Sequence, residues 1–258
     1  MKDYPLGELL GSGSYGTVYQ SSLGGIPLAV KVIEKRKRIS ALLEASIAER
    51  VAGHTNLVEL KDALLRADGC SMLVYLHGGQ SLEDICKSIT IDVPRARCML
   101  DCLAGLSYLH SLWLYHGDVK PGNILVQREE GVFKRARVAD LHQMVEVCPG
   151  NVRIGFCATT FQFQPPELLR GQKEASGALW LRADVWALGI TLCRLAGFSF
   201  IYNYPAAARC FPSCATCLTS ARLPGLGLFT QSLGPLASIS WTRSLCGLRR
   251  TGQIRRRA

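Results

Sequence analysis

The sequence predicts an α+β protein that begins mainly with strands and continues mainly with helices. Short runs rich in β-branched residues, separated by glycines, occur between residues 6 and 33 and again at 71–76. Longer segments of helical character follow at 95–111 and 185–193. Between these two segments, residues 116–123 read H-G-D-V-K-P-G-N, which gathers charged and polar side chains in a connecting loop.

A glycine-rich segment is the first motif. Residues 11–18 read G-S-G-S-Y-G-T-V and fit the pattern of a loop that covers nucleotide phosphates. Glycine allows φ > 0 and lets the backbone approach phosphate oxygens without a Cβ in the way. Dinucleotide-binding folds share this spacing, but there a helix follows the last glycine. Strand-like residues follow Gly16, so we expect a strand–loop–strand arrangement.

The next strand carries one charged residue. Residues 26–33 form an apolar, β-branched run that Lys31 interrupts. A lone lysine on a half-buried strand can extend its charged end into solvent, and this is the alternative interpretation. The position of Lys31 after the glycine-rich hairpin instead favours a phosphate-binding lysine.

A helix is predicted over residues 39–52, where Glu44, Ile47 and Val51 share one face. We therefore expect Glu44 to face the strand that carries Lys31 and to pair with it. Glu49 is the competing carboxylate, but its spacing places it away from that face.

The second predicted helix, residues 95–111, leads into the 116–123 loop. Its expected apolar side consists of Met99, Cys102, Leu103, Leu106 and Leu109.

Residues 116–123 combine three chemically different groups at short offsets. Asp118 offers a carboxylate that can accept a proton, Lys120 a fixed positive charge, and Asn123 an amide oxygen for a metal ion. Strands at 124–126 and 136–140 follow, and the second one ends at Asp140. Its carboxylate is the hard oxygen ligand that Mg²⁺ prefers.

In order along the chain, these motifs resemble those of the eukaryotic protein kinase family. Two further segments extend the resemblance, T-F-Q-F-Q-P-P-E at 160–167 and L-R-A-D-V-W-A-L-G-I at 181–190. The form D-x-K-P-x-N, with Lys120, is the serine/threonine version. The resemblance implies a two-lobed fold. Residues 4–76 would be a small antiparallel β lobe with one helix, and residues 77–198 a mainly helical, incomplete large lobe.

The family resemblance also implies ATP and Mg²⁺ as cofactors and a protein serine or threonine as the substrate. Asp118 and Lys120 would be catalytic, Asn123 and Asp140 would hold the metal, and Asp184 would cap the catalytic loop. In the activation segment, Thr160 would bond the catalytic aspartate. Glu167 would pair with an arginine from the end of a complete large lobe, which this sequence does not show, so we expect Glu167 to lack that partner. The implied ATP-binding residues are Gly11, Ser12, Gly13, Ser14, Gly16, Val18, Ala29, Lys31, Glu44, Val74, Leu76 and Leu125.

Two departures from the family pattern bear on activity. Gly117 replaces the arginine that normally pairs with a phosphate on the activation loop, so phosphorylation there has no evident partner. Leu141 and His142 replace the Phe and Gly of D-F-G, and histidine lacks the backbone freedom of glycine. The alternative function is therefore a pseudokinase, a nucleotide-binding scaffold with little or no turnover.

Residues 199–258 do not resemble the family. They contain eight arginines but no Asp, Glu or Lys, and so carry eight of the ten net positive charges. Proline and glycine recur too often for long helices, and we expect a poorly ordered basic tail. The tail could contact acidic partners. It gives no strong nucleic-acid or membrane signal, and its C-x-x-C at 214–217 lacks the second pair of a zinc site. The polar N-terminus favours a cytoplasmic location, with the nucleus as the alternative.

Overall fold

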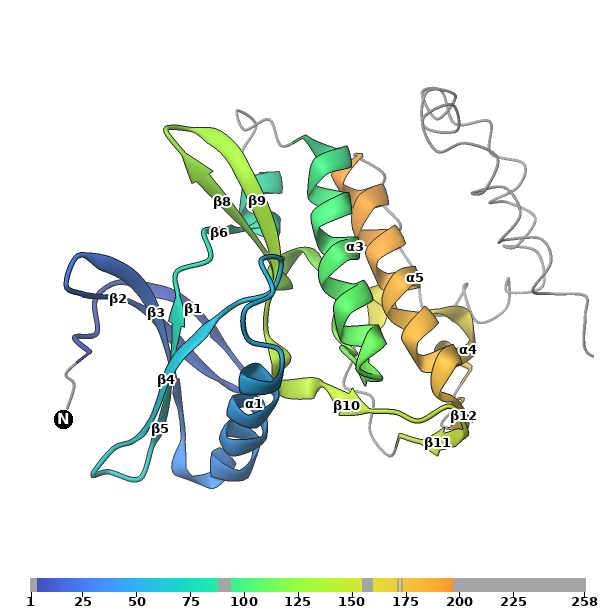
Figure 1. Cartoon of the computed structure of the whole chain (residues 1–258), viewed down its shortest axis with the longest axis horizontal. Helices are drawn as coiled ribbons and strands as arrows, with labels where there is room; N and C mark the ends of the chain where they lie inside the picture. Colours follow the sequence, from blue (N-terminus) through green and yellow to red (C-terminus); the bar gives the residue numbers. More distant parts are fainter. Residues whose placement is uncertain (1–3, 88–93, 155–159, 171, 173, 197–258) are drawn as a thin grey trace, which may run out of the picture. The chain divides into compact units, whose positions relative to one another are not determined.

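The N-terminal part forms an antiparallel sheet in the order β1-β2-β3-β5-β4 (Figure 1). On β3, alternate side chains face opposite sides, as the two-residue period of a strand requires. Leu28 and Val30 pack in a cluster on one face, while Ile33 belongs to the main core on the other. Lys31 shares the face of Ile33. The strands are β1 Leu9–Gly13, β2 Gly16–Leu23, β3 Ile26–Ile33, β4 Leu60–Leu65 and β5 Ser71–Leu76.

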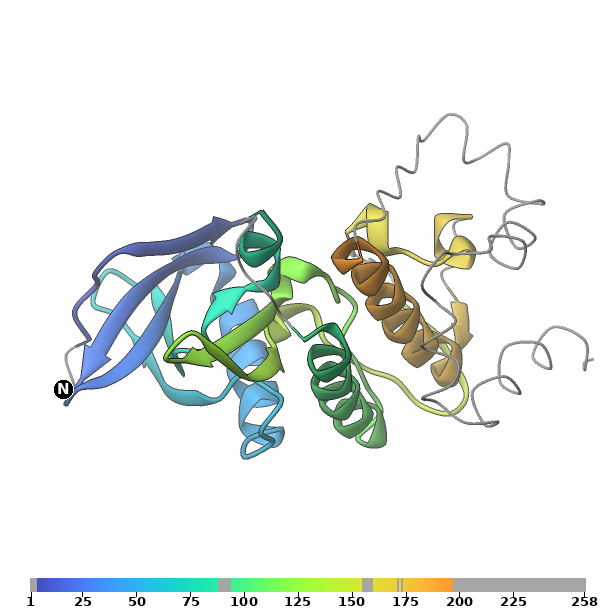
Figure 2. The same ribbon diagram turned by 90° about the horizontal axis from the view of Figure 1, so that it is seen from above.

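Helix α1, Arg38–Arg50, follows the short 3₁₀ turn Lys35–Lys37 and packs on the inner face of this sheet (Figure 2). Its buried residues are spaced by three and four positions, so they form one stripe. Three of them are alanines, which allow the helix to lie close to the strands, and the fourth is Glu44. The buried residues are Ala41, Glu44, Ala45 and Ala48.

Among the described residues of the large lobe there are a three-stranded sheet and four α-helices, and α3 and α5 lie side by side (Figure 1). The sheet consists of β6 Gln80–Ser81, β8 Ile124–Glu129 and β9 Val132–Val138. The helices are α2 Leu82–Lys87, α3 Arg95–Ser111, α4 Pro166–Leu169 and α5 Gly177–Leu195. Two small antiparallel ladders lie in the same part of the chain, β7 Leu114–Tyr115 with β10 Val145–Glu146, and β11 Asn151–Arg153 with β12 Glu174–Ser176.

The segment after α1 joins the two lobes at strand β9. The Val58 N–H donates to the Val138 carbonyl at 3.0 Å, and the Val138 N–H donates to the Asn56 carbonyl at 2.9 Å. The Asn56 side chain donates to the Ala136 carbonyl at 3.0 Å. These bonds fix the end of β9, two residues before Asp140, against the N-terminal lobe.

The buried face of α3 contains Cys102, Leu106 and Leu109 as expected, but Leu103 does not belong to it. Leu103 is 38% exposed, whereas Asp101 and Gly105 are buried. The Asp101 carboxylate accepts a hydrogen bond from the Ala136 N–H at 2.8 Å. A Cβ on Gly105 would lie 2.8 Å from the Asn56 carbonyl oxygen, so the helix approaches that backbone closely. A search for apolar residues at helical spacing does not find an aspartate and a glycine that are buried in such a face.

This computed structural model describes residues 4–87, 94–154, 160–170, 172 and 174–196, all within one compact unit that ends at Tyr202. The architecture confirms the predicted two-lobed α+β fold. The expectations for residues 199–258 fall outside the described residues. Within the described ranges, no helix has the length and apolar character that a membrane crossing requires.

Candidate active site

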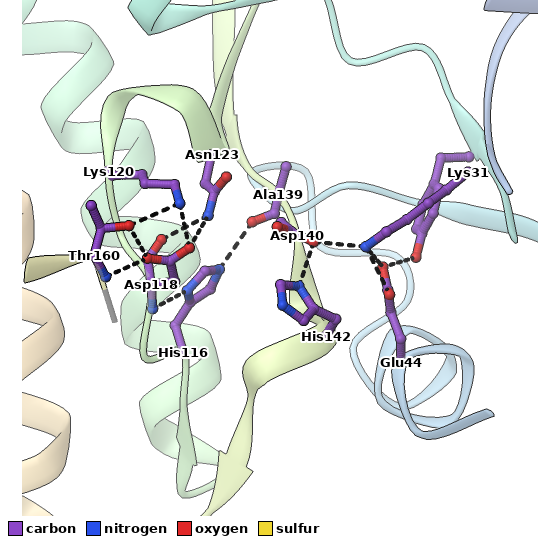
Figure 3. Close-up of polar contacts among 11 residues, drawn as sticks. Lys31, Glu44, His116, Asp118, Lys120, Asn123, Ala139, Asp140, His142 and Thr160 are labelled. Atoms are coloured by element: carbon purple, nitrogen blue, oxygen red, sulfur yellow. Dashed lines mark hydrogen bonds and ion pairs between the residues drawn. The ribbon is translucent and has the colours of Figure 1, made fainter. Parts of the chain in front are cut away.

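The first group of site residues surrounds the Lys31 ammonium (Figure 3). Its Nζ lies 3.0 and 2.9 Å from the two carboxylate oxygens of Glu44, and 2.8 Å from Asp140 Oδ1. Lys31 comes from β3, Glu44 from α1 and Asp140 from the chain just after β9. The predicted pairing of Lys31 with Glu44 is present, while Glu49 is exposed on another face of α1.

Burial and charge act in opposite directions on these groups. Burial lowers the pKa of Lys31, but the nearby carboxylates of Asp140 and Glu44 outweigh it and leave the pKa above its ordinary value. Burial raises the pKa of Asp140, but the hydrogen bond with His142 and the charge of Lys31 hold that pKa well below its ordinary value. Lysine is therefore held cationic and aspartate anionic, as the binding of phosphate and metal requires.

Tyr75 belongs to this group, and the sequence analysis missed it. Its hydroxyl donates to Glu44 Oε1 at 2.8 Å from the neighbouring strand β5. Burial, together with the negative charge of Glu44, raises the pKa of Tyr75 well above its ordinary value. Residues 44 and 75 lie far apart in sequence. Only the pairing of β3 with β5, in which Ala29 lies opposite Tyr75, could have indicated this contact.

Val74 and Leu76, which the family resemblance implies as ATP-binding residues, use their backbone within the sheet. Val74 lies inside the sheet, paired with Val30 on one side and Asp62 on the other, and its side chain is fully buried. The Leu76 N–H donates to the Glu59 carbonyl at 2.9 Å, so β4 already uses it. The strand ends at Leu76, and the connection that follows approaches Leu125. A Cβ on Gly78 would lie 2.5 Å from Leu125 Cδ1.

The glycine-rich loop, residues 11–18, spans β1, a two-residue turn and the start of β2. Gly16 must be glycine because a Cβ there would lie 2.7 Å from the Val32 carbonyl oxygen. A Cβ on Gly11 or Gly13 would meet no atom of the described chain within 4 Å, which leaves room for a ligand. Ser12, between these two glycines, and Ser14, after Gly13, are both exposed. Val18 lies opposite Lys31 in the strand pairing, and Ala29 is two residues before Lys31 on β3.

The second group of site residues surrounds Asp118. Lys120 Nζ donates to Asp118 Oδ2 at 2.6 Å, and Asn123 Nδ2 donates to the same oxygen at 3.1 Å. The N–H and hydroxyl of Thr160 donate to Asp118 Oδ1 at 3.0 and 2.8 Å. Lys120 Nζ also lies 2.9 Å from the Thr160 hydroxyl oxygen. The expected bond from Thr160 to Asp118 is therefore present.

Two buried side chains hold the loop around Asp118. Asp184 on α5 accepts hydrogen bonds from the N–H groups of His116 and Gly117, both at 2.9 Å, as the family resemblance implied. The His116 ring accepts from the Asp118 N–H at 3.2 Å and bonds the Ala139 carbonyl at 3.0 Å. Because Ala139 precedes Asp140, His116 links the two groups of site residues directly (Figure 3).

The oxygen atoms that Asp140 and Asn123 offer are suitable ligands for Mg²⁺. Among the described residues, both contacts of Asp140 use Oδ1, and Asn123 donates through Nδ2, so each keeps a free oxygen. Hard oxygen ligands of this kind favour Mg²⁺. Glu44, Asp140 and His142 also offer ligand atoms within 4.8 Å of one another. The Lys31 ammonium already lies between the two carboxylates and supplies the positive charge that a metal would bring there.

His142 does not strain the backbone as the sequence suggested. It lies in the 3₁₀ turn Leu141–Gln143 and is not among the residues with positive φ. Asp140 instead adopts the left-handed conformation, with φ of 66°. His142 Nδ1 lies 2.7 Å from Asp140 Oδ1, so this departure from D-F-G adds a contact to the site.

Glu167, in α4, is half-buried beside a small hollow formed with Trp180 and Ala183. Among the described lysines and arginines, none forms an ion pair with it. The arginine partner that the family pattern implies is thus absent from the part of the chain that the structure describes.

Comparison with known proteins agrees with this geometry. Residues 4–211 match the protein kinase domain family. The match extends past residue 198, where the sequence analysis placed the end of the large lobe. The chain is 31% identical over 207 residues to ribosomal protein S6 kinase 2 beta of Xenopus laevis, covering 78% of this chain and 32% of that protein. It is 31% identical over 208 residues to serine/threonine-protein kinase stk11 of Xenopus laevis, covering 73% and 46%.

A third relative is U-box domain-containing protein 34 of Arabidopsis thaliana, 33% identical over 202 residues, with 73% of this chain and 24% of that protein covered. The chain thus spans about a quarter to a half of the length of these relatives. Given the family match over most of its length and the fold that accompanies it, the chain belongs to the protein kinase domain family.

Proposed function

We propose that the chain is an ATP-dependent serine/threonine protein kinase that transfers the γ-phosphoryl group to a protein hydroxyl. One observation carries this proposal. His116 joins the residues around Asp118 to the group formed by Lys31, Glu44 and Asp140, because its ring contacts both the Asp118 N–H and the Ala139 carbonyl. Lys120 of the D-x-K-P-x-N loop, and the name of the relative stk11, support serine or threonine as the acceptor.

Phosphoryl transfer passes through a loose transition state, so the protein acts mainly by positioning groups and compensating charge. Asp118 would orient the acceptor hydroxyl and take its proton. Its own orientation is fixed on both oxygens, by Thr160 on one and by Lys120 and Asn123 on the other. Lys120 would then contact the γ-phosphate.

Lys31, held by Glu44, would bind the α- and β-phosphates. Asp140 and Asn123 would hold magnesium, and Val18, Ala29 and Leu125 would enclose the adenine. When bound, Mg²⁺ supplies positive charge that neutralises the phosphate oxygens.

A pseudokinase is the second candidate. One specific observation favours it, since Asp140 Oδ1 is shared between Lys31 at 2.8 Å and His142 at 2.7 Å. If these contacts persist when nucleotide is present, Asp140 keeps one oxygen for metal and turnover is low.

Transfer of labelled phosphate from ATP to a basic protein substrate distinguishes the two candidates. We expect transfer by the unmodified chain and a loss of about a hundredfold or more in Asp118→Asn, which removes the proton acceptor. Glu49→Gln, on the exposed side of α1, is the matched control and should retain activity. No transfer above the Asp118→Asn level in the unmodified chain would contradict the kinase proposal.

A nucleotide titration separates binding from turnover. We expect ATP to bind more tightly with Mg²⁺ than without it, and Asp140→Ala to remove that difference. Magnesium-dependent binding without transfer would identify the pseudokinase. Equal affinity with and without Mg²⁺ in the unmodified chain would contradict the metal assignment to Asp140 and Asn123.

A further inference from the structure

The turn of the glycine-rich loop contacts the segment that follows Asp140. Tyr15 lies on the two-residue turn between β1 and β2, and its ring centroid is 3.7 Å from that of His142, with the planes inclined by 39°. The His142 side chain is only 3% exposed. Its Nδ1 contacts Asp140, while its Nε2 has no hydrogen-bond partner among the described residues. The Tyr15 ring is thus a second contact of the His142 side chain, beside the Asp140 carboxylate.

A second contact holds the same turn from the side of α1. Lys37, just before α1, donates from Nζ to the Ser14 carbonyl oxygen. Its ammonium also lies 5.6 Å from the Tyr15 ring centroid, within the range of a cation–π contact. Ser14 and Tyr15 are thus fixed on two sides, although the flanking glycines make the loop backbone permissive.

The His142 ring contacts both the Tyr15 ring and the Asp140 carboxylate. The turn of the glycine-rich loop is therefore connected to Asp140 through one side chain. An aromatic pair adds specific stabilisation beyond its buried area. Tyr15 is not among the implied ATP-binding residues, whereas His142 contacts Asp140, a proposed metal ligand.

We propose that Tyr15 and His142 form a latch that holds the glycine-rich loop closed over Asp140, and that nucleotide enters when this latch opens. The proposal rests on the proposed function for its nucleotide, but the closed loop itself does not. His142 is in this view a positioning residue, and its replacement of the family glycine gives the loop a partner. The latch lowers the population of the open, binding-competent state and so slows nucleotide association.

The latch is tested first without nucleotide. Hydrogen–deuterium exchange of the peptide covering residues 9–18 should be about two- to twelvefold faster in Tyr15→Ala, the factor that an aromatic pair provides. Tyr15→Phe keeps the ring and should exchange like the unmodified chain. His142→Ala should also speed exchange, and the double variant should exchange no faster than Tyr15→Ala, because Tyr15→Ala already removes the contacts with both His142 and Lys37. Equal exchange in the unmodified chain and Tyr15→Ala would overturn the latch.

Nucleotide association is measured next by stopped flow with a fluorescent ADP analogue carrying the methylanthraniloyl group. We expect the association rate to rise in both Tyr15→Ala and His142→Ala, and to stay unchanged in Tyr15→Phe. Equal rates in all variants would refute the latch as a gate while leaving the proposed function intact. Absence of binding in every variant would refute the gate and the proposed function together.

Discussion

Asp184 accepts a hydrogen bond from the Gly117 N–H at 2.9 Å, although the two residues are 67 positions apart in the chain. The same carboxylate accepts from the His116 N–H and contacts His110 Nε2, each at 2.9 Å. Asp184 is 1% exposed, so water cannot replace these partners. The helix α5 therefore determines the conformation of the loop that carries Asp118.

Asp184→Asn should lower the free energy of unfolding by about 1–3 kcal/mol. The amide keeps one acceptor oxygen but turns a donor group toward the loop, so a buried N–H loses its partner. Urea unfolding measures the change. Glu49→Gln is the matched control on an exposed site and should shift stability by less than about 0.5 kcal/mol. An equal, small shift in both variants would show that Asp184 does not support the loop.

Thr160→Val should reduce phosphate transfer by roughly ten- to a hundredfold, because a misplaced catalytic group loses about this much. The Thr160 hydroxyl bonds Asp118 Oδ1 and lies 2.9 Å from Lys120 Nζ. Thr160→Ser retains the hydroxyl and should stay close to the unmodified rate. Steady-state kinetics should place the loss in kcat, with the KM for ATP little changed. A serine variant as impaired as the valine variant would contradict the role of the hydroxyl.

Tyr75→Phe should cost about 1–3 kcal/mol of stability at neutral pH, since a buried hydrogen bond to a carboxylate is removed. The pKa of Tyr75 is raised in the folded state, so its contribution is fully present below the unfolded value of about 10. It is lost as the pH rises through the folded pKa. Unfolding measured at pH 7 and near pH 11 should show the difference between the two proteins shrinking. A constant or growing difference would contradict this.

Gly117→Ala should destabilise the chain by roughly 1–2 kcal/mol. Gly117 has a φ of 80°, where a side chain is strained, and a Cβ would lie 3.2 Å from Tyr115 Cε1. Gly189→Ala is the control, since that helical glycine has open space around it and alanine is the better helix former. The midpoint temperature of thermal unfolding should therefore fall in Gly117→Ala and rise in Gly189→Ala. Equal shifts would show that the conformation of Gly117 has no cost.

Activity should not require phosphorylation of the activation segment. Gly117 cannot supply the cation that a phosphate there would engage, and Thr160 is already bonded to Asp118. Phosphatase treatment should leave the rate of phosphate transfer within about twofold. Its loss after treatment, with recovery on rephosphorylation, would contradict the prediction.

Local motifs were sufficient to place most of the site on its elements. The helical spacing of residues 39–52 selected Glu44 over Glu49, and the structure pairs Glu44 with Lys31. The short loop containing Asp118, Lys120 and Asn123 could be found from sequence because its groups are close together along the chain. The nearby carboxylate of Asp140 followed from the strand that leads to it.

Backbone recognition and buried faces were harder to predict. The family resemblance implied Val74 and Leu76 as ATP-binding residues, yet the hydrogen bonds of β4 and β5 decide which N–H groups remain free, as the bond from the Leu76 N–H to the Glu59 carbonyl shows. On α3, Asp101 and Gly105 are buried where an apolar pattern would select Leu103. Which residue is buried at such a position depends on a single carbonyl or N–H group of a neighbouring element.

The sequence by itself determined the fold class, the order of the motifs and the identity of the charged groups, because these are encoded in short spacings. Only the tertiary structure decided which distant groups meet. The contacts of Tyr75 with Glu44, Gly117 with Asp184, and Tyr15 with His142 depend on strand register, helix packing and a turn folded onto another segment. These contacts leave no periodic pattern in the sequence, so they become visible only in the folded chain.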